Sequence, residues 1–277
     1  MDKKLKKILI RTKKAIYSNK IGNNTSKFKG EGYDFSELRE YEDGEDVRKI
    51  DWIISAKVGK PYVKVFHAQR ELDINIVSLL SGSVYFGTTV SKQEVICEIA
   101  SLIGYSAISQ GDTFSSFIAN EDTTLLNKKT KNIFAVEKMV DGLYNYNVKG
   151  KTINYENLVN ELYKKIRKKS ILFLIGDFFN SKELNLNLLA KKHEVIAIVV
   201  RDKFEESPRE LGNVNLVDPS NYSSFEGVIN KDTVVKYEQV VKQNDEVLFQ
   251  SFKKWGIEYT KVYTYENVIA KMMRLFR

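Results

Sequence analysis

The sequence predicts a doubly wound α/β domain, in which helices cover both faces of a mostly parallel sheet. Segments that begin at Leu72, Ile171 and Glu194 are apolar runs of strand length. Runs of this kind are typical of strands that are buried on both faces, as in a parallel sheet. They alternate with segments of helical length such as residues 92–110, and this alternation favours parallel connections between the strands.

The elements follow one another in a regular order. A basic N-terminal helix precedes a predicted hairpin, in which residues 50–57 and 62–66 alternate in polarity on either side of a turn at Gly59, Lys60 and Pro61. The remaining predicted strands are 72–80, 113–119, 171–176, 194–201, 214–217, 224–229 and 258–263, of which 214–217 is expected to pair with 224–229. The remaining predicted helices are 92–110, 132–143, 156–168, 182–191, 233–255 and 266–276. This order is compatible with many doubly wound folds.

Length and composition favour a cytosolic protein. With 277 residues and a mass of 32.0 kDa, the chain can form one large α/β domain and an appended segment. The sequence has no apolar run that approaches the ~18 residues of a membrane helix. Its single cysteine, Cys97, cannot form an intramolecular disulfide, which is consistent with a reducing compartment.

The net charge of +8 is concentrated at the N-terminus. Residues 1–20 contain eight Lys and Arg residues and one acidic residue, and the rest of the chain is nearly neutral. We therefore do not expect a nucleic-acid interface, which would spread basic residues over a docking face. Leu5, Ile8, Leu9 and Ile16 share one side of the predicted helix and are expected to dock it on the domain. Contact of its basic side with an acidic partner or an anionic membrane surface remains open.

The most informative stretch is residues 30–71, a dense charged and aromatic block without a nucleophile–base pair, a Cys/His cluster or a phosphate-binding glycine loop. It closely resembles the conserved block of the bacterial family catalogued as domain of unknown function 58, whose members carry a von Willebrand factor A-like (vWA) domain. The matching positions are Gly30, Gly32, Asp34, Phe35, Arg39, Tyr41, Gly44, Asp46, Arg48, Ile50, Asp51, Trp52, Ser55 and Ala56. Residues 170–179, 193–201 and 255–277 resemble the family more loosely.

The resemblance implies a fold, a partner and a function. The fold would be vWA-like, with a small β-rich N-terminal extension. Residues 1–27 would be a basic helical segment, 28–70 the extension and 71–277 the vWA-like domain. Members of the family are typically encoded beside MoxR-type AAA+ ATPases. The resemblance therefore implies a non-enzymatic adaptor or chaperone-like protein that acts with such an ATPase, and with other vWA proteins.

The signature block has two interpretations. It is either an ion-pair lattice that fixes this segment in place or a recognition surface for a partner protein. Arg39 and Arg48 carry planar guanidinium groups that are suited to carboxylates. Their candidate partners are Glu37, Glu40, Asp43, Asp46 and Asp51. Four aromatic residues are expected to form a small apolar cluster. They are Phe35, Tyr41, Trp52 and Phe66.

The end of the first vWA strand defines the candidate metal site. Related vWA domains carry D-x-S-x-S there, and its Asp and Ser oxygens help to hold Mg²⁺ or Mn²⁺ in a metal-ion-dependent adhesion site. Here Leu79 replaces the Asp, whereas Ser81, Ser83 and the later Asp177 are retained, and Glu156 lies near the place of the family's Thr. Hard cations need several oxygen ligands, so we predict a degenerate site with weak divalent binding at most. A second interpretation is that Ser81 and Ser83 cap the following turn.

An enzymatic alternative stays open, namely a metal-dependent hydrolase or phosphotransferase that uses this strand-end site. A Ser81, Asp177 and His193 triad is disfavoured because glycines do not flank the serine as in a nucleophile elbow. Cys97 lies in an apolar helical segment, which indicates a buried and inert thiol. We predict a protein without enzymatic activity and without a required cofactor.

Overall fold

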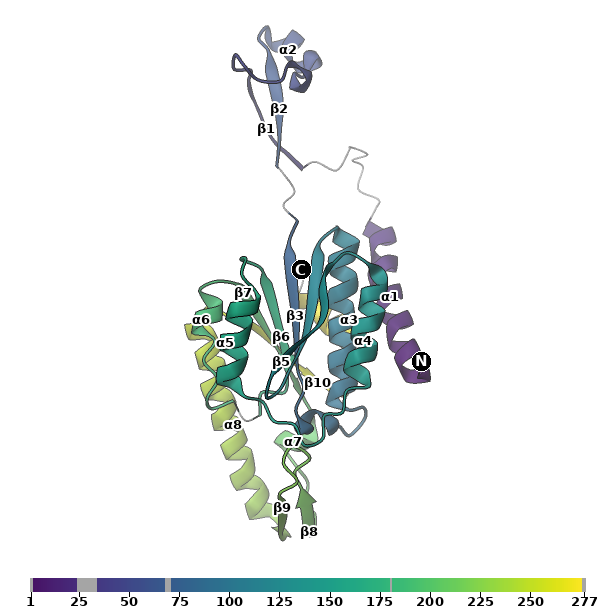
Figure 1. The fold of residues 1–277 in the computed structure, drawn as a ribbon, viewed down its shortest axis with the longest axis vertical. Helices are drawn as coiled ribbons and strands as arrows, with labels where there is room; N and C mark the ends of the chain where they lie inside the picture. The colour runs from purple at the N-terminus through teal and green to yellow at the C-terminus, as the bar shows by residue number, and fades with distance from the viewer. Residues whose placement is uncertain (1, 24–33, 68–70, 180, 276–277) are drawn as a thin grey trace. The chain divides into compact units, whose positions relative to one another are not determined.

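The computed structural model describes residues 2–23, 34–67, 71–179 and 181–275 of the chain (Figure 1). The chain divides into two compact units. The larger unit comprises Met1–Ile21 and Leu72–Arg277, and the smaller unit comprises Gly22–Glu71. The N-terminal helix thus belongs to the larger unit, and the signature block lies in the smaller one.

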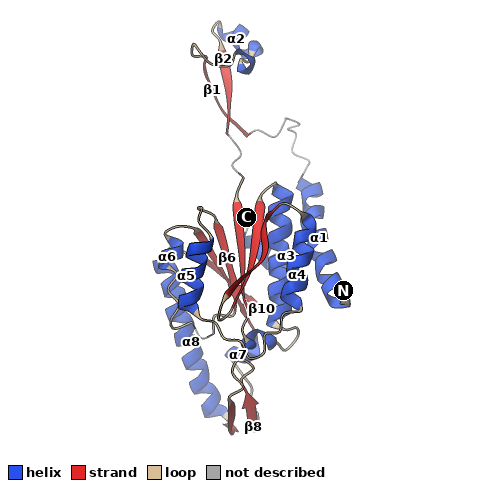
Figure 2. Cartoon of the chain, in the orientation of Figure 1, coloured by secondary structure: helices blue, strands red, loops and turns tan. Residues whose placement is uncertain are grey.

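A six-stranded sheet forms the centre of the larger unit, in the order β10-β7-β6-β3-β4-β5. Figure 2 shows its strands in red between the helices. Its strands are β3 (Asp73–Leu79), β4 (Thr113–Ala119), β5 (Thr123–Thr130), β6 (Ile171–Gly176), β7 (Glu194–Arg201) and β10 (Glu258–Tyr263). All neighbours pair in parallel except β4 and β5, which are antiparallel. The predicted α/β class with a mostly parallel sheet is confirmed.

Helices cover both faces of this sheet, as the sequence predicts. Two apolar clusters, one on each face, form the core. The helices of the first face are α1 (Lys3–Asn23), α3 (Lys92–Gln110), α4 (Ile133–Tyr144) and α9 (Val268–Leu275). Those of the second face are α5 (Tyr155–Lys165), α6 (Asn187–Ala190) and α8 (Lys231–Lys254). The short α7 (Lys203–Glu206) and the 3-10 helix η2 (Gly82–Tyr85) lie in connections after strands.

The N-terminal helix α1 docks by its apolar side. Leu5 and Leu9 are buried in the first core cluster, and Ile16 packs against that cluster while partly exposed. On the polar side, Lys4 pairs with Glu94 at 3.1 Å. The predicted docking side is therefore confirmed for Leu5, Leu9 and Ile16, whereas Ile8 is partly exposed. A membrane contact stays a prediction.

Two parts of the predicted order of the larger unit are wrong. The predicted helix 182–191 shortens to the single turn α6, because Asn185 and Asn187 favour turns and the Asn185 side chain accepts a hydrogen bond from the Asn187 amide at 3.2 Å. Strand β5 was not predicted. Half of its residues are exposed, and the charged Lys128 and Lys129 interrupt the apolar pattern of a strand, although charged residues are common on edge strands.

The smaller unit contains a two-stranded antiparallel sheet of β1 (Asp34–Glu40) and β2 (Tyr62–His67). The predicted β-rich extension is thus confirmed, but the predicted strand 50–57 is wrong. That segment instead forms most of helix α2 (Trp52–Val58), and the 3-10 helix η1 (Val47–Lys49) precedes it. Asp51 caps α2 by accepting from the Ile53 and Ile54 amides at 3.0 and 3.1 Å, and Gly59 ends it with a φ of 77°. This local capping outweighed the alternation in polarity.

Candidate functional site

The carboxyl edge of the large sheet brings three sequence-predicted residues together. Ser81 and Ser83 follow β3, and Asp177 follows the neighbouring strand β6. The Ser81 and Ser83 hydroxyl oxygens lie 2.7 Å apart, and Ser83 donates a hydrogen bond to the Asp177 carboxylate. Ser81 makes no capping bond to η2, so the capping interpretation is wrong for this residue.

A buried lysine stands at the centre of this edge. Lys92, the first residue of α3, has an exposed fraction of 0%. Its Nζ donates to Asp177 Oδ2 at 2.8 Å and to Glu205 Oε1 at 2.7 Å. We call Lys92, Asp177 and Glu205 the ammonium cluster. The lysine has two charged partners, which is the condition under which a buried charge is tolerated.

Lys92 and Glu205 were both missed in the sequence. One signal was available, because a lysine in the first helical turn faces the positive end of the helix dipole, where acidic residues are preferred. The two partners of Lys92 are 85 and 113 residues away along the chain, so no local sequence pattern predicts these ion pairs.

The two carboxylates of the ammonium cluster differ in their electrostatics. Burial alone would raise the pKa of Asp177, but the charges of Lys92 and Arg201, with hydrogen bonds from Lys92 and Ser83, hold it below its ordinary value. Burial raises the pKa of Glu205 above its ordinary value despite its pairing with Lys92, and the nearby charge of Asp177 adds to the rise. Asp177 is thus the more firmly ionised partner of Lys92.

A second layer of buried charge supports the cluster. Arg201, the last residue of β7, is buried, and its Nη2 donates to Asp245 Oδ1 on α8 at 2.8 Å. Its guanidinium carbon lies 3.8 Å from the centre of the Phe179 ring. Asp245 also accepts from Lys261 of β10 at 2.7 Å. These contacts tie β7, β10 and α8 together next to the strand ends.

Glu156 lies outside the ammonium cluster. It is an exposed residue in the first turn of α5 and lines a separate surface pocket with Glu183. The preceding residue, Tyr155, is buried in the second core cluster, and this burial, with the charge of Asp177, raises its pKa. In the described part of the chain, no group of three or more His, Cys, Asp and Glu residues is arranged to hold a metal ion.

The residues of the disfavoured triad are not assembled. Ser81 follows the carboxyl end of a parallel strand, whereas His193 precedes the amino end of β7, at the opposite edge of the sheet. The His193 ring bonds to the Ser170 hydroxyl at 2.9 Å. Cys97 is buried in α3, and burial raises the pKa of its thiol, as expected for an inert cysteine.

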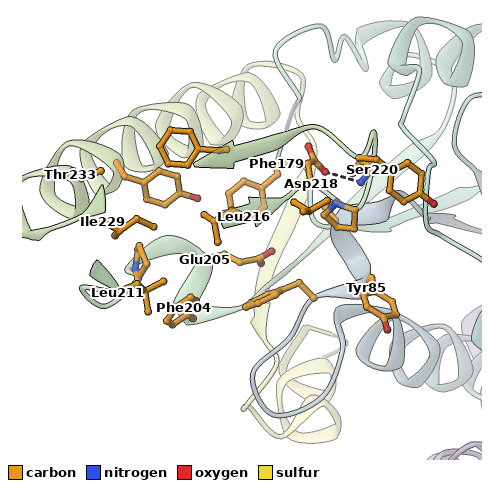
Figure 3. Close-up of a pocket in the computed structure, with 18 of the residues that line it drawn as sticks. Tyr85, Phe179, Phe204, Glu205, Leu211, Leu216, Asp218, Ser220, Ile229 and Thr233 are labelled. Atoms are coloured by element: carbon orange, nitrogen blue, oxygen red, sulfur yellow. Dashed lines mark hydrogen bonds between the residues drawn. The ribbon is translucent and has the colours of Figure 1, made fainter. Parts of the chain in front are cut away.

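A hairpin covers part of the strand-end site. It consists of β8 (Gly212–Val217) and β9 (Ser224–Ile229), which pair as the sequence predicts, in antiparallel direction. Its tip contacts the chain at Gly82, where an added Cβ would lie 2.3 Å from the Pro219 carbonyl carbon. The Gly150 amide donates to the Pro219 carbonyl at 2.8 Å. Ser83 also lines a groove beside this contact. Glu205, which is labelled in Figure 3, belongs to the same lining.

In the smaller unit, the predicted arginines form local pairs. Arg39 Nη1 donates to Glu45 Oε2 at 2.9 Å, and Arg48 Nε donates to Asp46 Oδ1 at 3.0 Å. Hydrogen bonds from these arginines, Arg39 to Glu45 and Arg48 to Asp46, lower the pKa of each carboxyl. Asp51, besides capping α2, pairs with Lys64.

The predicted aromatic cluster of the signature block is wrong for Trp52. Its exposed fraction is 68%, and the neighbouring Ile53 is also exposed. Tyr41 turns its hydroxyl to the Glu45 carbonyl at 3.1 Å. The side chains of Phe35 and Phe66 lie outside the described residues. Helix α2 therefore presents apolar side chains on the surface rather than in a cluster.

Within the described residues, no helix is both long and apolar enough to span a membrane.

The sheet, its two helical layers and the strand-end residues define an α/β protein of the vWA-like type. The chain belongs to the family described as "Protein of unknown function DUF58", whose model matches residues 37–247.

The chain is similar in sequence to two mycobacterial proteins and in structure to two solved proteins. "Uncharacterized protein Mb1516" of Mycobacterium bovis and "Uncharacterized protein Rv1480" of Mycobacterium tuberculosis are each 27% identical over 210 residues, or 71% of this chain. The chain spans 64% of the length of these relatives. BatB of Bacteroides thetaiotaomicron is similar with 10% identity and a TM-score of 0.41, over 67% of this chain and 98% of BatB. The SpRpn10 VWA domain is similar with 8% identity and a TM-score of 0.42, over 74% and 95% of the two chains.

Proposed function

We propose that this protein is a cytosolic, non-enzymatic adaptor or chaperone-like protein that acts with a MoxR-type AAA+ ATPase, and that its adhesion site is degenerate. The observation that carries the proposal is the Lys92 ammonium, which lies within 2.8 Å of an Asp177 and a Glu205 oxygen. In the vWA domains that the sequence resembles, a divalent cation is held at these strand ends. A side chain of this protein supplies the positive charge instead.

The ammonium changes what the site can do. A divalent cation that bound Asp177 Oδ2 would have to displace Lys92, which would leave an unpaired ammonium in a buried place. Millimolar Mg²⁺ is therefore expected to shift the melting temperature little. A metal-dependent hydrolase or phosphotransferase would require that same displacement, so this alternative has less support than the adaptor.

The partner would then contact surfaces other than a bound metal. Helix α2 offers Trp52 and Ile53, both largely exposed, and Arg48 has 87% of its side chain exposed. Exposed aromatic and arginine side chains are the residues that most often dominate protein interfaces. The signature block is thus a candidate recognition surface, as one of its two interpretations requires.

The test is reconstitution with a purified MoxR-type ATPase. We expect a complex that survives a chelator and that Trp52→Ala weakens while leaving the circular dichroism spectrum unchanged. Leu125→Ala, a change at an exposed apolar residue of edge strand β5, is the matched control. Absence of a complex would refute the adaptor proposal. A complex that dissociates on chelation, or substrate turnover that a chelator abolishes, would refute the degenerate site.

A further inference from the structure

The sides of the N-terminal helix α1 have different surroundings. Leu5 and Leu9 bury one side in the first core cluster. Four exposed lysines share another side, because the helix has 3.6 residues per turn. They are Lys3, Lys6, Lys7 and Lys13, which we call the lysine face. Figure 1 shows α1 at the outer margin of the larger unit, beside α3 and α4.

Two other cations of α1 lie between these sides and pair with the neighbouring helix α3. Lys4 pairs with Glu94 at 3.1 Å, and Arg11 Nε lies 3.5 Å from Glu98 Oε1. The lysine face differs from this flank, because its four ammonium groups make no ion pair with a carboxylate of the described residues. Its positive charge is therefore not neutralised by the fold.

The charge of the lysine face is also concentrated. Residues 1–20 contain eight basic residues and one acidic residue, Asp2, whose carboxylate accepts from the Lys4 amide and the Tyr144 hydroxyl. Lys3 and Lys13 are separated by about 15 Å along the helix, at a rise of ~1.5 Å per residue. A rigid row of cations without counter-ions of its own is complementary to an anionic surface.

The type of cation favours an anionic membrane over an acidic protein. Arginine is enriched and lysine is depleted at protein interfaces, and the planar guanidinium binds carboxylates in a fixed geometry. The single arginine of α1, Arg11, is directed to Glu98 and to Asn267, so the cations of the lysine face are all lysines. Flexible and strongly hydrated ammonium groups suit a layer of lipid phosphates, which requires no fixed geometry.

The burial of the other side of α1 determines the mode of contact. A membrane-surface helix usually inserts its apolar side into the bilayer, but Leu5 and Leu9 already lie in the core of the domain. Ile10 lies among the lysines and is 58% exposed, and one such side chain is too small to anchor the protein. Contact would therefore be peripheral, electrostatic and sensitive to salt.

We propose that the lysine face binds the anionic phospholipid headgroups of a membrane surface, with α1 lying parallel to that surface and staying docked on the larger unit. The inference goes beyond the ATPase partnership and does not depend on it, because it rests on the charges and burial of α1 alone.

The experiment sediments the full chain with vesicles of phosphatidylcholine, either alone or mixed with phosphatidylglycerol in equal parts. We expect binding to the mixed vesicles only, and loss of binding as salt screens the charges. The variant that combines Lys3→Gln, Lys6→Gln, Lys7→Gln and Lys13→Gln should lower the partition coefficient by about a hundredfold or more. Each basic residue near an anionic membrane contributes about fivefold, which gives this expectation.

A matched control removes the same number of charges at other exposed positions. It combines Lys164→Gln, Lys168→Gln, Lys169→Gln and Lys254→Gln. This control has the same net charge as the lysine-face variant, so it separates a local face from the total charge of the protein. Its binding to the mixed vesicles should change little. Circular dichroism verifies that both variants are folded.

Several outcomes would overturn the proposal. They are absence of binding to the mixed vesicles, equal binding to both kinds of vesicle, and an equal effect of the two four-site variants. Polyglutamate and RNA provide a further comparison. If the chain binds either polymer through the lysine face but does not bind the mixed vesicles, the occupant is another macromolecule and the membrane assignment is wrong.

Discussion

Ion pairs occur in both units of the molecule, but their surroundings differ. In the ammonium cluster, Lys92 and Asp177 are buried, and each depends on the other for the stability of its charge. In the signature block, Arg48 and Asp46 make a pair of similar geometry, at 3.0 Å, with most of the arginine in solvent. Water can replace either partner of the exposed pair, whereas it cannot reach the buried one. The same chemistry is therefore structural in the sheet and available for recognition in the signature block.

The largest effect should come from removing the buried ammonium. Lys92→Met keeps the length of the side chain and leaves the buried Asp177 and the partly buried Glu205 without their cation. We expect the free energy of unfolding to fall by about 3–5 kcal/mol at neutral pH, measured by urea titration. Lys60→Met, which breaks an exposed pair with Glu40, is the control and should change little. Equal effects of the two substitutions would refute the contrast between the units.

The next effect is pH-dependent and concerns Asp177. Because its pKa is lower in the folded than in the unfolded protein, its ionisation stabilises the fold above about pH 4, and this contribution disappears as the pH falls through the lower folded pKa. Asp177→Asn should cost about 2 kcal/mol at neutral pH. The stabilities of the two proteins should converge on acidification. A constant difference at all pH values would show that the charge of Asp177 contributes nothing.

The pKa shift of Glu205 is opposite in direction to that of Asp177. Its pKa is higher in the folded protein, so the protonated form favours the fold at low pH, and this contribution is lost as the pH rises through the folded pKa. Glu205→Gln should therefore reduce stability less than Asp177→Asn at neutral pH. Urea titrations of both variants at neutral pH provide the measurement. A larger loss for Glu205→Gln would reverse our assignment of the firmer partner.

A smaller and local effect is expected in the signature block. Asp51→Ala removes the cap of α2 and the pair with Lys64. Amide hydrogen exchange should accelerate in residues 53–58 and remain unchanged in the large sheet, because the two regions belong to different compact units. Faster exchange in β3 would show that the units are energetically coupled.

The smallest effect on stability should come from Arg48→Ala. The arginine is exposed and its partner is two residues away, so urea titration should find no measurable change. If the signature block is a recognition surface, the same variant should bind the ATPase more slowly, with a smaller dependence on salt. A destabilised variant would instead favour the ion-pair lattice.

The fold was largely predictable because its central strands are continuous apolar runs in the sequence. The runs 171–176 and 194–201 coincide with β6 and β7, since strands buried on both faces must be apolar throughout. The strand prediction for residues 50–57 is wrong because their alternating polarity fits a strand, whereas the cap at Asp51 and the left-handed residue Gly59 make the segment helical. Both the helix cap and the terminating glycine are visible in the sequence.

The candidate site was predictable only in part. Ser81, Ser83 and Asp177 could be placed together because the ends of adjacent parallel strands share one edge. Glu156 could not be placed, because its position depended on a weak match to the family. Lys92 and Glu205 were missed because burial of a lysine depends on partners that the fold brings from distant positions.

The covalent attachment of Lys92 to α3 keeps a positive charge at these strand ends at all times. A dissolved metal ion occupies its site according to its concentration and leaves when the supply falls. An ammonium that is covalently attached to α3 has no such exchange, because the backbone fixes its local concentration. The charge balance at these strand ends is therefore fixed by the amino-acid sequence. Chelation, depletion of metal ions or a flux of divalent ions in the cell would not alter it.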